Sequence, residues 1–132
     1  MLDARFRLVC APGALRDAPA DWTRAMLEEG ELALMPGSGG LDEIDEVARA
    51  LGLASVAVVR REPAPDDQAQ VVAAHAGELA LVWVAPSFSQ RSRDWARERG
   101  PMTLLVECDG PLAAAERARI TRFVAALGRQ SE

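Results

Sequence analysis

The stretch Leu79-Ala80-Leu81-Val82-Trp83-Val84-Ala85-Pro86 decides the fold. Residues 79–85 carry no polar side chain, and both alternating faces are apolar, a pattern typical of a strand buried on both sides. The run is too short to cross a membrane. Pro86 ends it because proline cannot donate a hydrogen bond to a sheet. A strand covered on both faces needs helices above and below it, so the sequence predicts a layered α/β protein.

Strand and helix patterns alternate five times along the chain. The predicted strands span residues 5–10, 31–35, 55–61, 79–85 and 102–107. The predicted helices span residues 19–29, 41–51, 66–76, 90–99 and 112–127. Strands separated by helices of this length favour a parallel sheet with right-handed crossovers. We therefore expect residues 1–132 to form a single three-layer α/β/α domain with five mostly parallel strands, flavodoxin-like or similar. A ligand of such a domain binds at the carboxyl ends of the strands.

Short polar residues and glycines mark the expected helix ends. The candidate N-terminal caps of the first, third and fourth helices are Asp17 or Asp21, Asp66, and Ser87 or Ser89. Glycines at positions 30, 52 and 77 follow the first three helices and are natural stops.

The charge balance is acidic, with 20 Asp and Glu against 15 basic residues and a formal net charge of -5. All the basic residues are arginine, so no lysine can form a Schiff base or hold a phosphate. An acidic balance argues against general binding to nucleic acid. The cysteines, Cys10 and Cys108, are not spaced as a metal-ligand pair, and the N-terminal residues lack a signal peptide's apolar core. We expect a cytoplasmic protein with reduced thiols and without cofactor, metal or membrane contact.

A cysteine and an arginine lie six positions apart at the end of the first predicted strand, in Cys10-Ala11-Pro12-Gly13-Ala14-Leu15-Arg16. The spacing resembles the phosphate loop of the low-molecular-weight tyrosine phosphatases. The resemblance implies a thiolate nucleophile at Cys10 and an anion held by Arg16 and by backbone amides such as that of Gly13. Pro12 removes one amide from such a cradle, Asp17 adds a repelling charge, and no Asp-Pro pair supplies the family's general acid.

Three further motifs favour structural interpretations. The loop Gly37-Ser38-Gly39-Gly40 lacks the spacing of a nucleotide-binding loop and precedes acidic residues that would repel a phosphate, so we interpret it as a connector. Carboxylates at positions 42, 43, 45 and 46 diverge around a helix and predict a solvated face. The single histidine, His75, has no identifiable catalytic or zinc-binding partners.

Arginines crowd the fourth predicted helix and the end of the third predicted strand. The candidate binding residues of this surface are Arg60, Arg61, Arg91, Arg93, Trp95 and Arg97. Residues 1–59 carry five arginines against ten acids, whereas residues 60–132 carry ten of each. This asymmetry suits contacts between the acidic helix 41–51 of one copy and the arginine-rich helix 90–99 of another, which would give a salt-sensitive homodimer.

A longer stretch resembles the C-terminal half of Mrr-type restriction-endonuclease domains. It comprises residues 81–89, Trp95-Ala96-Arg97-Glu98-Arg99-Gly100 and Leu104-Leu105-Val106, about a third of the chain. The matching places for the family's catalytic residues, near Asp42 and in Val58-Val59-Arg60, lack its lysine and its second carboxylate. Residues 41–51 form a predicted helix where that family has a strand. The resemblance implies at most a nuclease fold without nuclease activity.

Three functions follow from these patterns, in order of preference. The first is a non-catalytic protein-interaction or regulatory module, which binds a protein partner or itself as a homodimer. The second is a small enzyme or phosphate-ligand binder that uses residues 10–16, and it requires a lowered pKa of Cys10. The third is a degenerate restriction-endonuclease-like module that binds nucleic acid through the arginine surface.

Overall fold

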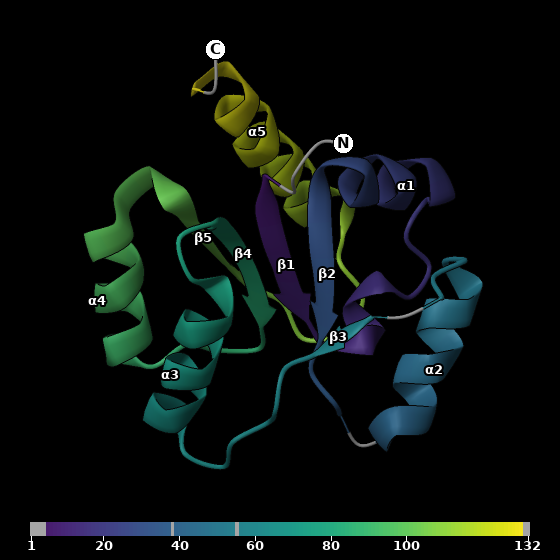
Figure 1. Ribbon diagram of the computed structural model, residues 1–132, viewed down its shortest axis with the longest axis horizontal. Coiled ribbons are helices and arrows are strands. Elements are labelled where there is room, and N and C mark those ends of the chain that lie inside the picture. Colours follow the sequence, from purple (N-terminus) through teal and green to yellow (C-terminus); the bar gives the residue numbers. More distant parts are fainter. Residues whose placement is uncertain (1–4, 38, 55, 131–132) are drawn as a thin grey trace.

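The computed structural model describes residues 5–37, 39–54 and 56–130. Five parallel strands form one sheet in the order β3-β2-β1-β4-β5 (Figure 1). The strands are β1 (Phe6–Cys10), β2 (Gly30–Leu34), β3 (Ala57–Val58), β4 (Ala80–Ala85) and β5 (Thr103–Glu107). The helices are α1 (Ala20–Glu29), α2 (Gly40–Ala50), α3 (Pro65–Ala76), α4 (Gln90–Arg99) and α5 (Ala114–Gln130), with 3₁₀ turns η1 (Pro12–Leu15) and η2 (Gly100–Met102). The predicted alternation of strand and helix is confirmed.

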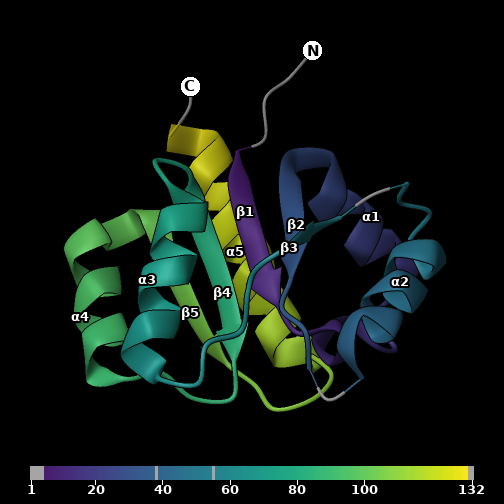
Figure 2. The same ribbon diagram turned by 60° about the horizontal axis from the view of Figure 1, so that its bottom comes forward.

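The helices form two layers, one on each face of the sheet. Helices α1, α2 and α5 contribute Met26, Ile44 and Ile120 to one apolar cluster, and α3 contributes Val72 to the cluster on the opposite face. The half-buried Trp95 of α4 packs against that second cluster. In Figure 2, α5 passes behind the sheet while α3 lies in front of it. The structure is thus the three-layer α/β/α arrangement that the sequence predicts.

Strand β4 is buried on both faces, as its composition predicts. It pairs with β1 on one side and with β5 on the other. Val82 packs with the α1, α2 and α5 layer, whereas Leu81 and Trp83 pack with the α3 and α4 layer. The strand therefore stabilises both cores at once.

The strand order places a topological switch point between β1 and β4. A flavodoxin-like sheet has the order 2-1-3-4-5, whereas this sheet has the other common order of doubly wound folds, with β1 between β2 and β4. The chain leaves β1 toward α1 on one face and reaches β4 from α3 on the other face. The loops that follow β1 and β4 therefore diverge and leave a crevice at the carboxyl edge of the sheet.

Several predicted helix caps and the length of one predicted strand are wrong. No side chain caps α1, because Pro19 occupies the cap position and Asp17 instead adopts a left-handed turn with φ 62°. Asp66 lies inside the first turn of α3, since Pro65 begins that helix and Ala64 precedes it. The third strand contains two residues rather than seven, and both are exposed at the sheet edge. Position 55 of the prediction lies outside the described residues.

No helix within the described residues has the length and apolar character needed to cross a membrane.

Candidate functional site

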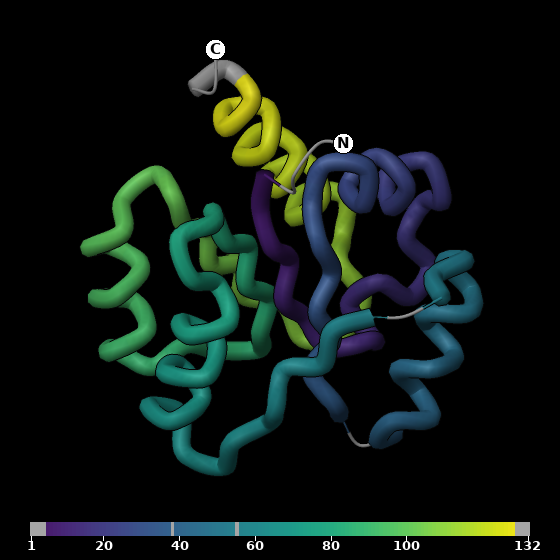
Figure 3. The backbone as a smooth tube through the Cα atoms, viewed as in Figure 1, coloured from purple at the N-terminus to yellow at the C-terminus, as the bar shows by residue number. Residues whose placement is uncertain are grey.

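A cavity of about 390 Å³ occupies the carboxyl edge of the sheet at the switch point. Its floor is formed by Ala11 after β1, Met35 after β2 and Trp83 near the end of β4. One wall is the loop between β3 and α3, and the other is the segment that joins β4 to α4. Figure 3 shows the chain after β3 running along this edge before it turns into α3. We call this space the carboxyl-edge cavity.

The wall beside α4 is fixed by a serine cap. Pro86 ends β4 because it has no backbone N–H, and Ser89 then begins the helix as its N-cap. The Ser89 Oγ accepts a hydrogen bond from the Ser92 N–H at 3.1 Å, and the two serine hydroxyls lie 3.1 Å apart. Ser92 is 1% exposed and Ser89 is half-buried, so the cap lies against the fold. Of the two caps expected for this helix, Ser89 is the residue that the structure selects.

The wall beside α3 is held by hydrogen bonds of one glutamine. The Gln68 Oε1 accepts from the Glu62 N–H at 2.8 Å, and its Nε2 donates to the Arg60 carbonyl at 3.0 Å. The Arg61 Nε donates to the Pro36 carbonyl at 2.5 Å, which ties this loop to the end of β2. The loop that presents Arg61 and Glu62 to the cavity is therefore bonded at three points.

The apolar part of the cavity centres on two aromatic side chains. The ring centroids of Trp83 and Phe88 lie 4.9 Å apart with an interplanar angle of 77°, an edge-to-face pair. Trp83 is 3% exposed, and its indole Nε1 has no hydrogen-bond partner among the described residues. The Nε1 atom is itself buried, so its N–H is not exposed to the cavity.

The two helix N-termini at this edge differ in charge. The first turn of α3 contains Asp66 and Asp67, which complement its dipole. The first turn of α4 contains no acid and instead carries Arg91, and Arg93 follows two residues later. The α4 N-terminus consequently presents positive potential that its own sequence does not neutralise.

Few groups in the cavity can transfer protons or act as nucleophiles. Among the described lining residues, Glu62 is the only carboxylate, and it forms an ion pair with Arg60. The serine hydroxyls of the α4 cap bond each other rather than a base. Within the described part of the chain, no group of three or more His, Cys, Asp or Glu side chains is arranged to hold a metal ion. The polar side chains of the described lining are Arg61, Glu62, Gln68 and three serines.

The arginine surface expected from the sequence is divided by the fold. Arg61 lines the carboxyl-edge cavity, whereas Arg60, Arg91, Arg93, Trp95 and Arg97 do not. Three of these arginines lie in ion pairs: Arg60 with Glu62, Arg93 with Glu107, and Arg97 with Asp94 at 3.3 Å. The Arg99 guanidinium lies 5.0 Å from the centroid of the Trp95 ring. Arg61 is therefore the one predicted binding residue of this surface that lines the cavity, and the other five lie outside it.

The anion loop expected at residues 10–16 has a different conformation. Cys10 is fully buried, and burial raises the pKa of its thiol to about 12. Nucleophilic chemistry requires a lowered pKa, so that prediction for Cys10 is wrong. Residues after it form the η1 turn, in which the Ala14 and Arg16 amides donate to the Ala11 and Gly13 carbonyls. Arg16 pairs with Glu43 at 3.6 Å. These amides and this arginine already have partners.

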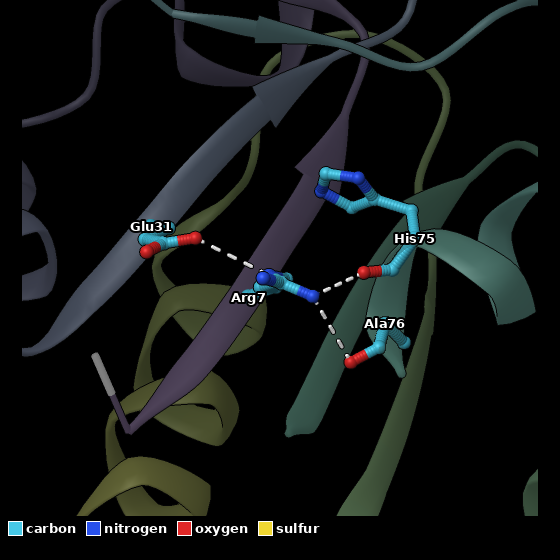
Figure 4. Close-up of polar contacts among 4 residues, drawn as sticks. All are labelled: Arg7, Glu31, His75 and Ala76. Carbon is cyan, nitrogen blue, oxygen red and sulfur yellow. Dashed lines mark hydrogen bonds and ion pairs between the residues drawn. The ribbon is translucent and has the colours of Figure 1, made fainter. Parts of the chain in front are cut away.

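The remaining sequence motifs have structural surroundings. The imidazole of His75 lies near the amino-terminal end of the sheet, where Arg7 donates to the carbonyl oxygens of His75 and Ala76 (Figure 4). A Cβ on Gly39 would lie 2.3 Å from Oε2 of Glu43, so a carboxylate stands at the start of α2, where it would repel a phosphate. Ser38 of that loop lies outside the described residues. Helix α2 stands where Mrr-type domains have a strand.

The sequence does not identify Trp83, Gln68 and Ser92 as site residues. In the sequence, each resembles an ordinary core or helix residue. Their place in the cavity follows from the strand order, which brings the ends of β1, β2 and β4 together. The available signal was Pro86 followed by a serine cap, which marks where the loop after β4 starts and ends.

No family model, curated protein or solved structure matches the chain.

Proposed function

We propose that the protein is a non-catalytic regulatory module that binds a small molecule in the carboxyl-edge cavity. The observation that carries this proposal is the position of the cavity, which lies at the switch point between β1 and β4. Doubly wound folds bind their ligands at this point because neighbouring loops diverge there. The volume of about 390 Å³ falls within the range of small-molecule sites.

The walls of the cavity support a preformed site. The Ser89 cap fixes one wall, and the bonds of Gln68 fix the other. Walls held by internal hydrogen bonds lose little conformational freedom when a ligand binds, which favours affinity. The lining combines a few polar groups with Met35, Trp83 and Phe88, the composition expected of a ligand pocket.

The absence of an activated nucleophile from the described lining supports binding rather than catalysis. The chain's buried thiol, Cys10, is not among the lining residues, and Glu62 is engaged by Arg60. We assign the output of the module to protein contacts, with a partner or a second copy, through the exposed acidic face of α2 and the arginine-rich face of α4. Self-association that weakens between 50 and 500 mM salt is the expected behaviour, and salt-independent dimers would contradict this assignment.

The cavity assignment is tested by a plugged variant. Ser87 is exposed and lines the cavity, so Ser87→Trp fills the space without replacing a core residue. Ala125→Trp adds the same ring to an exposed position of α5 outside the cavity and is the matched control. A fragment library is screened by thermal shift and ligand-observed NMR. Fragments that bind the wild type and Ala125→Trp but not Ser87→Trp support the proposal. Equal binding to all three proteins, or no binding, contradicts it.

A further inference from the structure

Strand β5 leaves one edge of the sheet open. It ends the strand order, and within the described residues it pairs with β4 alone. The Cys108 N–H donates to the Ala85 carbonyl at 2.9 Å, and successive residues of a strand point their backbone groups to opposite sides. The N–H and C=O groups of Leu105 and Glu107 therefore point away from β4. They have no hydrogen-bond partner among the described residues.

Little in β5 protects this edge from pairing with another chain. Proteins usually protect an edge strand with proline, charged side chains or a bulge. Residues 103–106 contain neither proline nor a charged side chain, and the pairing of β5 with β4 is continuous. The opposite edge differs, because β3 contains two residues and is too short to pair with another strand.

A groove of about 550 Å³ lies at the open edge, between α4 and α5. Its lining comes from both faces of the sheet: Phe88, Arg93, Leu105 and Glu107 from the side of α4, and Ala115, Glu116, Arg119 and Arg122 from α5. A groove that is lined from both faces crosses the sheet edge itself, which is where an added strand would lie.

The groove carries positive charge that the protein does not pair. It contains three arginines and two glutamates. Glu107 pairs with Arg93, and Glu116 accepts a hydrogen bond from a backbone N–H at the start of α5. Arg119 and Arg122 are exposed, lie one turn apart on α5 and make no ion pair within the described residues. They are free to pair with acidic side chains of a partner.

We propose that the edge of β5 binds an extended acidic segment of a partner protein, which adds a sixth strand to the sheet. The backbone of this segment pairs with the outward N–H and C=O groups of Leu105 and Glu107. Its side chains point alternately to the two faces of the sheet. Acidic side chains on one face pair with Arg119 and Arg122, and apolar side chains on the other face pack against Leu105 and Phe88.

A second copy of this chain is a poorer occupant of the edge. In a symmetric pair of β5 strands each copy would bring the same groove, so Arg119 and Arg122 of both copies would approach one another. Like charges that face one another across paired strands are destabilising. The acidic residues at positions 42, 43, 45 and 46 lie in a helix and cannot supply an extended strand.

The test measures the binding of fluorescein-labelled peptides by fluorescence anisotropy. The probe has the sequence Gly-Glu-Val-Glu-Val-Glu-Gly, with the label at its N-terminus and an amide at its C-terminus. The control peptide has glutamine in place of each glutamate. We expect the acidic peptide to bind at least about tenfold more tightly than the control.

Two methylated versions of the acidic peptide test the backbone pairing. One carries N-methyl groups on its valines and the other on its glutamates. In an added strand, alternate N–H groups point to β5 and the others point to solvent. One of the two versions should therefore lose binding while the other retains it. Equal affinities of the two versions would contradict strand addition.

Variants of β5 and α5 locate the bound segment. Glu107→Pro removes an outward N–H but no bond to β4 and should abolish binding, whereas Glu107→Gln keeps this N–H and should bind at least as tightly as the wild type. The double variant Arg119→Gln, Arg122→Gln should weaken the acidic peptide about five- to tenfold. Arg49→Gln removes an exposed arginine of α2 outside the groove and should change nothing. Circular dichroism confirms that each variant is folded.

The outcomes separate this inference from the proposed function. If no peptide binds, or if Glu107→Pro binds as tightly as Glu107→Gln, the inference is wrong. If Arg49→Gln weakens binding as much as the double variant of α5, general surface charge attracts the peptide and the inference is overturned. Among the described lining residues, only Phe88 is common to the groove and the carboxyl-edge cavity. Fragment binding in that cavity should be equal in the wild type and Glu107→Pro, so failure of this inference leaves the proposed function intact.

Discussion

The Phe88 ring meets the Trp83 ring edge to face, with centroids 4.9 Å apart and an interplanar angle of 77°. The pair connects β4 with the segment that leads into α4. It therefore links the packing of the sheet to the shape of the carboxyl-edge cavity.

Replacing Phe88 tests this link. Phe88→Ala removes the edge-to-face contact and a half-buried ring, so the free energy of unfolding should fall by about 1–3 kcal/mol in urea titrations. Leu41→Ala is the control, because Leu41 is 63% exposed and its truncation should change stability by less than about 0.5 kcal/mol. Equal losses in the two variants would show that the aromatic pair contributes nothing beyond ordinary surface contact.

Gly30 is required by a close approach rather than by its backbone angles. A Cβ at Gly30 would lie 2.5 Å from Cζ of the buried Phe6 ring. Gly30→Ala should therefore lower the free energy of unfolding by about 1–3 kcal/mol. A Cβ at Gly13 meets no atom within 4 Å, so Gly13→Ala should remain within about 1 kcal/mol of the wild type. If Gly30→Ala left the free energy of unfolding unchanged, the Phe6 ring would be able to move away from the added Cβ.

Hydrogen bonds from Arg7 of β1 connect the C-terminus of α3 to the sheet. Its Nη1 donates to the Ala76 carbonyl at 3.3 Å and to the His75 carbonyl, while its Nε lies 3.2 Å from Glu31 Oε2 (Figure 4). Arg7→Ala removes both hydrogen bonds, although the Ala76 carbonyl still accepts from the Leu79 N–H at 3.1 Å, and should cost about 1–2 kcal/mol of stability. Arg24→Ala, which breaks an exposed pair with Asp21, should cost almost nothing by the same denaturation assay.

The single histidine gives stability a pH dependence below neutrality. Burial, and then the nearby Arg7 charge, lower the pKa of His75 below its usual 6.5, while Glu31 opposes the shift. The unfolded chain therefore binds a proton at higher pH than the folded chain. Stability should be full above pH 6.5 and should fall as the pH drops from 6.5 through the folded-state pKa of His75. His75→Gln should remove this fall between pH 7 and pH 5, and an unchanged slope would contradict the assignment.

The two thiols should differ in accessibility. Cys10 is fully buried with a pKa raised to about 12, whereas Cys108 is partly exposed and donates weakly to the Gly110 and Pro111 carbonyls. Burial, with the Glu116 and Asp109 carboxylates, also raises the pKa of Cys108, so its reaction should be slow but measurable. A thiol-disulfide reagent at pH 8 should modify one equivalent in the native protein. The Cys108→Ser variant retains only the Cys10 thiol, so it should react with the reagent only when it unfolds. Rapid reaction of the folded variant would mean that Cys10 is accessible.

The layers of the fold were predictable because they depend on local composition. The run that ends at Pro86 is apolar on both faces, which required helices on both sides of β4. The strand order depends on which face each crossover helix covers, and no single segment encodes it. The expected third strand was too long because Ala57 and Val58 lie at an exposed edge with one neighbouring strand, where apolar sequence does not ensure pairing.

The candidate site was predictable only in fragments. Ser89 was expected as a cap and Arg61 as a binding residue, but nothing in their spacing indicated that both line one cavity. Their proximity follows from the path of the loop after β3, which returns along the carboxyl edge. The unpaired N–H of Trp83 could not be predicted from the sequence, because its three-dimensional surroundings decide whether an indole N–H finds an acceptor.

The most direct test of the account is a titration of ¹⁵N-labelled protein with the fragments that bind the wild type, followed by ¹H–¹⁵N correlation spectra. The account predicts saturable shifts centred on the amides of residues that line the carboxyl-edge cavity, among them Glu62, Ser87 and Phe88. The amides around Ala125 in α5, outside the cavity, should stay unchanged. Shifts that are as large around Ala125 as at the cavity, or that are absent, would contradict the central claim that this cavity binds a small molecule.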